Sequence, residues 1–221
     1  LEGAYHGNTN SLVEISPYKY RSEGGFEPPG HVHEVPMPDP YRGRYRGRTR
    51  ETGQKYAEHV MRTVGRLDAD GRGPAAFVAE PLLGCGGQIV PPPGFLEEAF
   101  RHVREAGGIC VADEVQTGFG RVGTDFWAFE TQGVVPDVVT VGKPMGNGHP
   151  VAAVVARSEV AERFDSGMEY FNTFAGSPVS CRVGSAVMDV IEEEGLQERA
   201  RRVGGRLEDG LRELADRHPV L

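Results

Sequence analysis

This sequence has no long apolar run, few cysteines and no excess of positive charge. No stretch of its 221 residues approaches the roughly 18 apolar residues that a membrane-spanning helix needs. The 32 acidic residues outnumber the 24 basic ones, and the net charge of −8 disfavours nucleic-acid binding, because phosphate contacts need a concentrated positive field. The 3 cysteines are widely spaced, a pattern that fits a reducing compartment and neither a zinc site nor a disulfide framework. No export leader opens the chain, so we expect a cytoplasmic protein without a membrane, nucleic-acid or metal partner.

One arginine-rich stretch, residues 41–50, runs against this charge balance. Taken alone, arginines around a tyrosine are typical of an RNA-binding arm. A solvated loop or an interface contact explains the same residues, and the acidic surroundings favour that interpretation.

What the sequence does contain is an alternation of strand and helix patterns. We expect strands over 75–82, 108–115, 137–142 and 152–156 and a helix over 95–106. This order predicts an α/β fold with a mostly parallel sheet covered by helices on both faces. Ligands of such sheets gather at the carboxyl ends of the strands, so chemistry is expected just after Leu82, Val115 and Gly142.

The flanks of this alternation are less regular. Residues 31–35 form a short strand candidate in a stretch rich in glycine and proline. A helical period over 51–67 places Tyr56, Val60, Met61 and Val64 on one face. From residue 179 onward we expect helices, interrupted near Gly195.

Lysine is scarce, and one lysine stands at a strand end. Only Lys19, Lys55 and Lys143 are lysines among the 24 basic residues. Lys143 follows the apolar run 136–142 and precedes a loop with little side-chain bulk. An amine at the end of a buried strand loses solvent, which lowers its pKa and makes it a usable nucleophile, although a lysine reaching from a strand end to solvent gives the same pattern.

A second strand end delivers carboxylates. Asp113 and Glu114 follow an apolar run, with Gln116 close behind. A buried carboxylate is costly unless a cation or a strong donor meets it. A protonated pyridine nitrogen, a magnesium ion and a structural arginine all meet this condition.

Residues 118–123 match the Gly-x-Gly-x-x-Gly pattern and raise a dinucleotide-binding oxidoreductase as a rival. The preceding strand end carries acidic residues where a pyrophosphate would approach, and Thr124-Asp125 follows in place of an apolar helix face. The pattern therefore fits this rival poorly.

Two further segments gain meaning only in combination. Tyr5 stands on a turn, where a buried loop anchor is the simpler explanation. Residues 171–176 place Thr173 ahead of a helix that begins near Pro178. The start of this helix can bind an anion, although a simple helix cap explains the same residues.

Together these segments resemble the class III aminotransferases, enzymes of pyridoxal 5′-phosphate (PLP) with the fold-type I architecture. The resemblance rests on Tyr5-His-Gly, Ala79-Glu-Pro, Asp113-Glu-Val-Gln-Thr-Gly-Phe-Gly-Arg, Val141-Gly-Lys and Asn172-Thr-Phe. It implies that Lys143 forms a Schiff base with PLP and then shuttles the proton of a primary amine substrate. It further implies that Asp113 pairs with the pyridinium nitrogen, that Gln116 lies near the phenolic oxygen and that Tyr5 covers one face of the ring.

The resemblance also implies a homodimer with a shared active site. Thr173 resembles the phosphate ligand that this family donates from the neighbouring subunit, and Glu80 is the expected supporting carboxylate. Residues 1–175 would belong to the PLP-binding large domain, and residues 176–221 would lead towards a small C-terminal domain.

Two departures from the family pattern bear on activity. Many transaminases of the family carry a glutamate in the turn after the strand that pairs with a substrate-gating arginine, and here the position is Cys85. Residues 84–94, 142–150 and 168–173 are most similar to the branch of ethanolamine-phosphate and 5-phosphohydroxylysine phospho-lyases. Transaminase activity and phosphate elimination from a phosphoamine therefore both stay open.

The second departure is missing sequence. Residue 1 is leucine, and the family's phosphate-binding loop and small domain would lie outside residues 1–221, so we expect a fragment of an α/β large domain that is incomplete at both ends. An inactive fragment or a degenerate homologue is the third interpretation.

Overall fold

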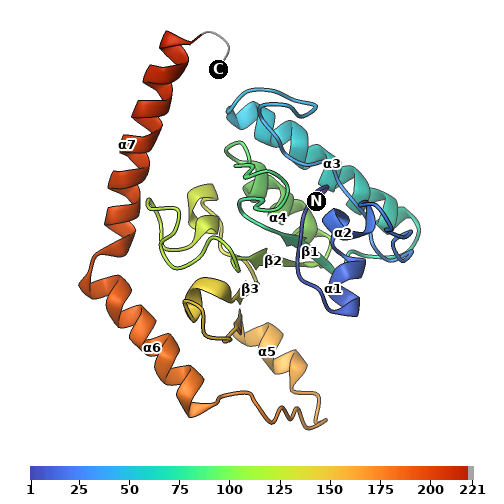
Figure 1. The fold of residues 1–221 in the computed structure, drawn as a ribbon. Helices are drawn as coiled ribbons and strands as arrows, with labels where there is room; N and C mark the ends of the chain where they lie inside the picture. Colours follow the sequence, from blue (N-terminus) through green and yellow to red (C-terminus); the bar gives the residue numbers. More distant parts are fainter. Residues whose placement is uncertain (219–221) are drawn as a thin grey trace.

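The computed structural model describes residues 1–218, and a sheet lies at its centre (Figure 1). In these residues the strands are β1 (Ala76–Ala79), β2 (Ile109–Asp113), β3 (Val138–Val141) and β4 (Ala153–Ala156). Their order in the sheet is β1-β2-β3-β4; β1, β2 and β3 are parallel, and β4 is antiparallel to β3. The strands predicted over 75–82, 108–115, 137–142 and 152–156 are all present, each somewhat shorter than predicted, and the expectation of a mostly parallel sheet is confirmed.

Helices surround this sheet. They are α1 (Asn10–Glu14), α2 (Pro17–Tyr20), α3 (Arg50–Ala69), α4 (Phe95–Glu105), α5 (Ser158–Phe164), α6 (Pro178–Glu193) and α7 (Leu196–Arg217), with short 3₁₀ helices η1 (Ala128–Gln132) and η2 (Lys143–Met145). Gly195 separates α6 from α7 in a left-handed conformation with φ of 57°, which confirms the predicted interruption. None of the helices within residues 1–218 is long and apolar enough to cross a bilayer.

Helix α3 forms where the periodicity predicts it. The Thr49 hydroxyl accepts a hydrogen bond from the Thr52 N–H and caps the helix. Tyr56 and Val60 are buried as expected, but Met61 is 42% exposed, so its predicted place on the buried face is wrong. A residue directly after Val60 is turned about 100° around the helix axis, away from the stripe that faces the core.

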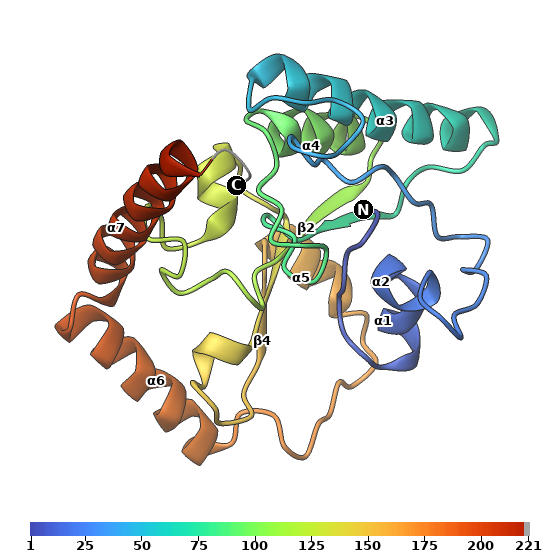
Figure 2. The same ribbon diagram turned by 45° about the horizontal axis from the view of Figure 1, so that its top comes forward.

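Helices α3 and α4 lie side by side and cover one face of the sheet (Figure 2). Phe95, Leu96, Ala99, Phe100 and Val103 of α4 are each at most 1% exposed. Cys110 and Ala112 of β2 lie in the same core cluster and are fully buried. The hydrophobic core is therefore the layer between this helix pair and the sheet.

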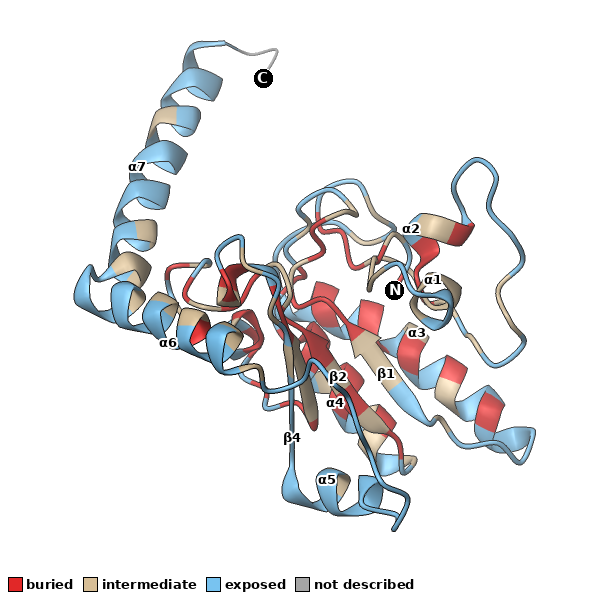
Figure 3. Cartoon of the chain, turned by 60° about the horizontal axis from the view of Figure 1, so that its bottom comes forward, coloured by how far each residue is buried: buried red, intermediate tan, exposed pale blue. Residues whose placement is uncertain are grey.

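The opposite face of the sheet has less cover. Ile109 and Val111 of β2 alternate with the buried Cys110 and Ala112 but are only half-buried. Figure 3 shows buried segments on α3 and α4 and none on α5 or α7. The sheet is flanked by helices as expected, but the well-buried helices α3 and α4 share one face.

The segment before α3 is irregular. Residues 31–35 do not form the predicted strand: the Glu2 N–H donates to the Val35 carbonyl and the Val32 N–H closes a turn onto Pro29, with no ladder of paired bonds. Residues 41–50 are anchored on α3, because the Tyr45 N–H donates to the Tyr56 hydroxyl over 3.0 Å. This anchoring favours the loop interpretation of the arginine-rich stretch.

Candidate active site

Polar side chains gather at the carboxyl edge of the parallel strands, as predicted. Glu80 directly follows β1, Asp113 ends β2, and Lys143 begins η2 just after β3. Asp113 is in register with Thr140, and the Glu114 N–H donates to the Thr140 carbonyl over 2.9 Å. Since β2 and β3 are parallel neighbours, the groups that follow them emerge at one edge.

Asp113 is a buried carboxylate with two donors. Its side chain is 9% exposed; Oδ1 accepts from the Val115 N–H over 3.1 Å, and Oδ2 lies 2.8 Å from Nδ1 of His6. The His6 side chain is itself only 4% exposed. A carboxylate offers about four acceptor positions, so Asp113 can accept a further N–H from a ligand.

Glu80 ties the Tyr5 segment to the end of β1. It is buried; Oε1 accepts from the Tyr5 N–H and Oε2 from the Gly84 N–H, each over 2.9 Å. Burial raises the pKa of Glu80, while these two N–H groups favour its charged form and oppose the shift. The half-buried Tyr5 ring packs edge-on against Tyr18, with centroids 5.9 Å apart. Glu80 thus fixes the backbone that presents the Tyr5 ring.

Lys143 and Gln116 share a pocket of about 300 Å³. Arg121, Pro144, Asn147 and Gly148 complete its lining. Lys143 is exposed, so the expectation that the strand end removes this amine from solvent is wrong for the chain alone. The turn of η2 buries Pro144 and leaves its neighbour Lys143 on the open side.

Gln116 also contacts the turn after β1. Its Nε2 lies 3.8 Å from Sγ of Cys85. A Cβ at position 84 would lie 2.6 Å from the same nitrogen, so a larger residue there would displace the Gln116 amide. Cys85, the residue at which the sequence departs from the transaminase pattern, therefore lines the same edge.

Thr173 is not brought to this edge. It lies exposed in the segment between α5 and α6, where the Phe174 N–H donates to Oδ1 of Asn172 over 3.0 Å. Its predicted contribution to a neighbouring subunit stays a prediction.

Glu114 is a buried residue of this edge that sequence reasoning did not assign. Its Oε2 accepts from the Thr117 hydroxyl over 2.7 Å and its Oε1 from the Phe129 N–H over 2.8 Å. Burial raises the pKa of Glu114, and these donors oppose the shift. Glu114 thereby pins both ends of the loop that carries Gln116.

The same loop excludes the dinucleotide interpretation. That fingerprint needs a helix opening at the last glycine, whereas residues 118–123 form turns. Gly120 and Gly123 have φ of 75° and 80°, and a Cβ on them would lie 2.9 Å from the Gln197 side chain and 2.7 Å from the Arg201 backbone nitrogen. These glycines therefore allow α7 to approach the loop.

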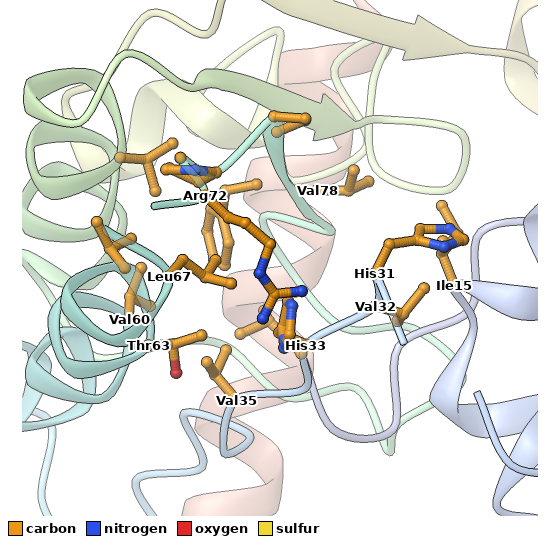
Figure 4. Close-up of a pocket in the computed structure, with 18 of the residues that line it drawn as sticks. Ile15, His31, Val32, His33, Val35, Val60, Thr63, Leu67, Arg72 and Val78 are labelled. Atoms are coloured by element: carbon orange, nitrogen blue, oxygen red, sulfur yellow. The ribbon is translucent and has the colours of Figure 1, made fainter. Parts of the chain in front are cut away.

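A separate cavity of about 390 Å³ lies between α3, β1 and residues 31–35 (Figure 4). Its walls are mainly aliphatic, with His31, His33 and Arg72 among them, and it reaches the amino end of β1 at Ala75. The cavity lies towards the amino edge of the sheet, opposite the carboxyl edge that carries Asp113 and Lys143. His6 also contributes to its wall. Within residues 1–218, the carboxyl edge is where an exposed amine, Lys143, and a buried carboxylate, Asp113, lie at the ends of adjacent strands.

Comparison with known proteins fixes the family. The model for "Aminotransferase class-III" matches residues 1–221. The chain belongs to the class III aminotransferases. A class III relative from Drosophila melanogaster, "Alanine--glyoxylate aminotransferase 2-like", is 51% identical over 208 residues, which cover 92% of this chain and 42% of the relative.

Two solved structures share the fold. A phospholyase from Arthrobacter in complex with phosphoethanolamine matches with a TM-score of 0.87 and 36% identity, over 98% of this chain and 50% of that one. An omega transaminase from Pseudomonas jessenii in complex with PMP matches with a TM-score of 0.86 and 31% identity, over 99% of this chain and 49% of that one. The fold-type I prediction is confirmed, and this chain spans about half the length of the class III relatives it matches.

Proposed function

We propose that the protein containing this chain is a PLP-dependent class III enzyme that acts on a primary amine, with transaminase activity. The observation that carries the proposal is the placement of Asp113 and Lys143 at the ends of adjacent parallel strands. The residues fit the cofactor: Asp113 keeps acceptor positions for a ring N–H, and the Lys143 amine has no hydrogen-bond or ion-pair partner among residues 1–218. PLP, when bound, supplies an electron sink for a substrate carbanion.

The residues divide the work as follows. Lys143 would hold the cofactor through Nζ, and its amine would take the α-proton of the substrate and return it. Asp113 would keep the ring nitrogen protonated by accepting its N–H. Gln116, which shares a pocket with Lys143, would bind the phenolic oxygen, and Tyr5, whose N–H is held by Glu80, would cover one ring face.

A phospho-lyase that eliminates phosphate from a phosphoamine is the second candidate. Cys85 favours it, because the turn after β1 offers no acidic side chain at this position to pair with a substrate-gating arginine. The likeness to a phospholyase that binds phosphoethanolamine supports the same candidate.

The proposal includes an assembly and a location. We expect a cytoplasmic homodimer in which the exposed Thr173 serves the site of the other subunit. We assign residues 1–175 to the cofactor-binding domain and residues 176–221 to the helices that leave it; residues 219–221 lie outside the described part of the chain.

Absorbance of the full-length protein tests cofactor attachment. Wild type incubated with PLP should develop a visible band that sodium borohydride abolishes, and Lys143→Ala should not develop it. Lys55→Ala is the matched control, because Lys55 is an exposed lysine of α3 paired only with Glu51. A colourless wild type would contradict the proposal and favour a degenerate homologue.

Product assays separate the two chemistries. The full-length protein is incubated with phosphoethanolamine, and separately with an amino donor and a 2-oxo acid. Amino transfer without phosphate release from any phosphoamine would exclude the lyase; phosphate release without transfer would exclude the transaminase.

A further inference from the structure

We infer that His6 is a positioning residue that aims the Asp113 carboxylate at the cofactor nitrogen, and that this role requires the N–H at its Nδ1. The inference rests on the proposed function. Its observation is the contact of 2.8 Å between Nδ1 of His6 and Oδ2 of Asp113, which joins buried side chains 107 residues apart in the sequence.

The contact answers an energetic need of Asp113. A carboxylate that is 9% exposed loses most of its water, and the Val115 N–H satisfies only Oδ1. Nδ1 of His6 is the side-chain donor to Oδ2 among residues 1–218. With both oxygens held, the carboxylate plane is fixed and the remaining acceptor positions have defined directions.

The backbone of His6 is itself held in place. Its N–H donates to the Ser16 hydroxyl over 2.9 Å, and that hydroxyl, fully buried, donates to the Leu12 carbonyl. The next residue, Gly7, has φ of 133°, and a Cβ there would lie 2.6 Å from a methyl group of Leu12. The ring therefore starts from a fixed backbone rather than from a mobile loop.

Tyr5 and His6 together connect two strand ends. The Tyr5 N–H bonds to Glu80 at the end of β1, and the His6 ring bonds to Asp113 at the end of β2. The charged and titratable groups around His6 are these two carboxylates and, across the cavity whose wall it shares, His31, His33 and Arg72. Only Asp113 is within hydrogen-bond distance of the ring in the described residues.

Substitutions at position 6 of the full-length protein test the role of the N–H. His6→Leu removes the donor and keeps apolar volume, whereas the amide nitrogen of His6→Asn can stand where Nδ1 stands. Loss of a hydrogen bond to a charged group predicts that His6→Leu weakens PLP binding by roughly 10-fold to 100-fold, while His6→Asn recovers most of the affinity. His31→Leu is the control on the same cavity and should bind PLP as wild type does.

Three readouts separate positioning from folding: the PLP dissociation constant from fluorescence titration, the absorption spectrum of the bound cofactor, and kcat measured apart from KM. A lower kcat and an altered spectrum in His6→Leu, both restored in His6→Asn, support the inference. Wild-type PLP affinity and spectrum in His6→Leu overturn it.

A further pair of variants covers a folding failure. If thermal unfolding shows that His6→Leu does not fold, His6→Asn is compared with His6→Gln, whose amide extends towards the place of Nε2. Tighter PLP binding by His6→Asn supports the inference, and equal binding overturns it. A wild type that binds no PLP would contradict the proposed function instead, so the two failures are distinguishable.

Discussion

Helices α4 and α7 differ in where their apolar residues face. The apolar stripe of α4 lies against the sheet, and five of its residues are at most 1% exposed. The stripe of α7, formed by Val203, Leu207, Leu211 and Leu214, has the same helical spacing but is 39% to 63% exposed. Both stripes have helical spacing, whereas the stability of the chain depends on the stripe that is covered.

The largest expected effect lies in the covered stripe. Phe100→Ala in the 221-residue chain should lower the free energy of unfolding by roughly 3–5 kcal/mol, because it opens a cavity beneath β2. Leu211→Ala, at a position 56% exposed, should change it by less than about 0.5 kcal/mol. Urea unfolding measures both; equal losses would show that α7 is packed as tightly as α4.

A buried ion pair should have the next largest effect. The side chain of Asp137 is 9% exposed. Its carboxylate accepts hydrogen bonds from the Cys110 N–H over 2.8 Å and from the Arg104 guanidinium over 3.1 Å. Asp137→Ala should cost about 2–3 kcal/mol. The matched control is Glu198→Ala, which breaks an exposed pair with Arg201 on α7 and should cost less than about 1 kcal/mol.

The Asp137 contribution depends on pH. Burial alone would raise the pKa of Asp137, but the bonds from Arg104 and Cys110 and the nearby Arg157 outweigh burial and hold it below its usual value. The stabilisation is therefore fully present above the ordinary Asp pKa of about 3.9 and is lost as the pH falls through the lower folded-state value. The unfolding free energies of wild type and Asp137→Ala should converge in acid; a constant difference would contradict this.

Glu114 should show a smaller effect of opposite sign. Because burial raises the pKa of Glu114, the folded state binds its proton more tightly, and stability falls as the pH rises from the ordinary Glu value to the folded-state value. Glu114→Gln should differ from wild type by about 1 kcal/mol and gain stability relative to it over this pH range. Unfolding measured against pH tests the difference, with Thr117→Val as a variant that removes the donor but keeps the carboxylate.

The exposed stripe should give the smallest change in stability. The double variant Leu207→Gln/Leu211→Gln should keep the unfolding free energy of the 221-residue chain within about 1 kcal/mol and reduce its self-association, because it removes exposed apolar surface. Light scattering measures the association. A strong loss of stability would show that the stripe already has a partner surface.

The sequence predicts this fold well where local pattern and burial agree. The β-branched runs locate all of the strands, and the residues that follow β1, β2 and β3 meet at one edge as the parallel order requires. The strand predicted over 31–35 does not form because a strand needs a partner along its length. Here the Val35 carbonyl accepts only the Glu2 N–H. The predicted burial of Met61 is wrong because this residue is next to the buried stripe of its helix but not part of it.

The site is less predictable, since contacts between distant residues decide it. His6 lies inside the Tyr5-His-Gly segment, but its bond to Asp113 spans 107 residues, and no local pattern distinguishes it from other histidines. The sequence could have indicated the structural role of Glu114, because a second carboxylate directly after Asp113 at a buried strand end also needs hydrogen-bond donors. The exposure of Lys143 follows from the turn of η2, which the strand pattern does not describe.

The bridge made by Tyr5 and His6 limits how the chain can change in length. Because neighbouring residues reach Glu80 and Asp113, an inserted residue between them would pull one bond out of reach. The exposed turn around Gly24 holds no such bridge, and a Cβ there would meet nothing within 4 Å. Loop grafting or the insertion of a reporter peptide belongs at this turn.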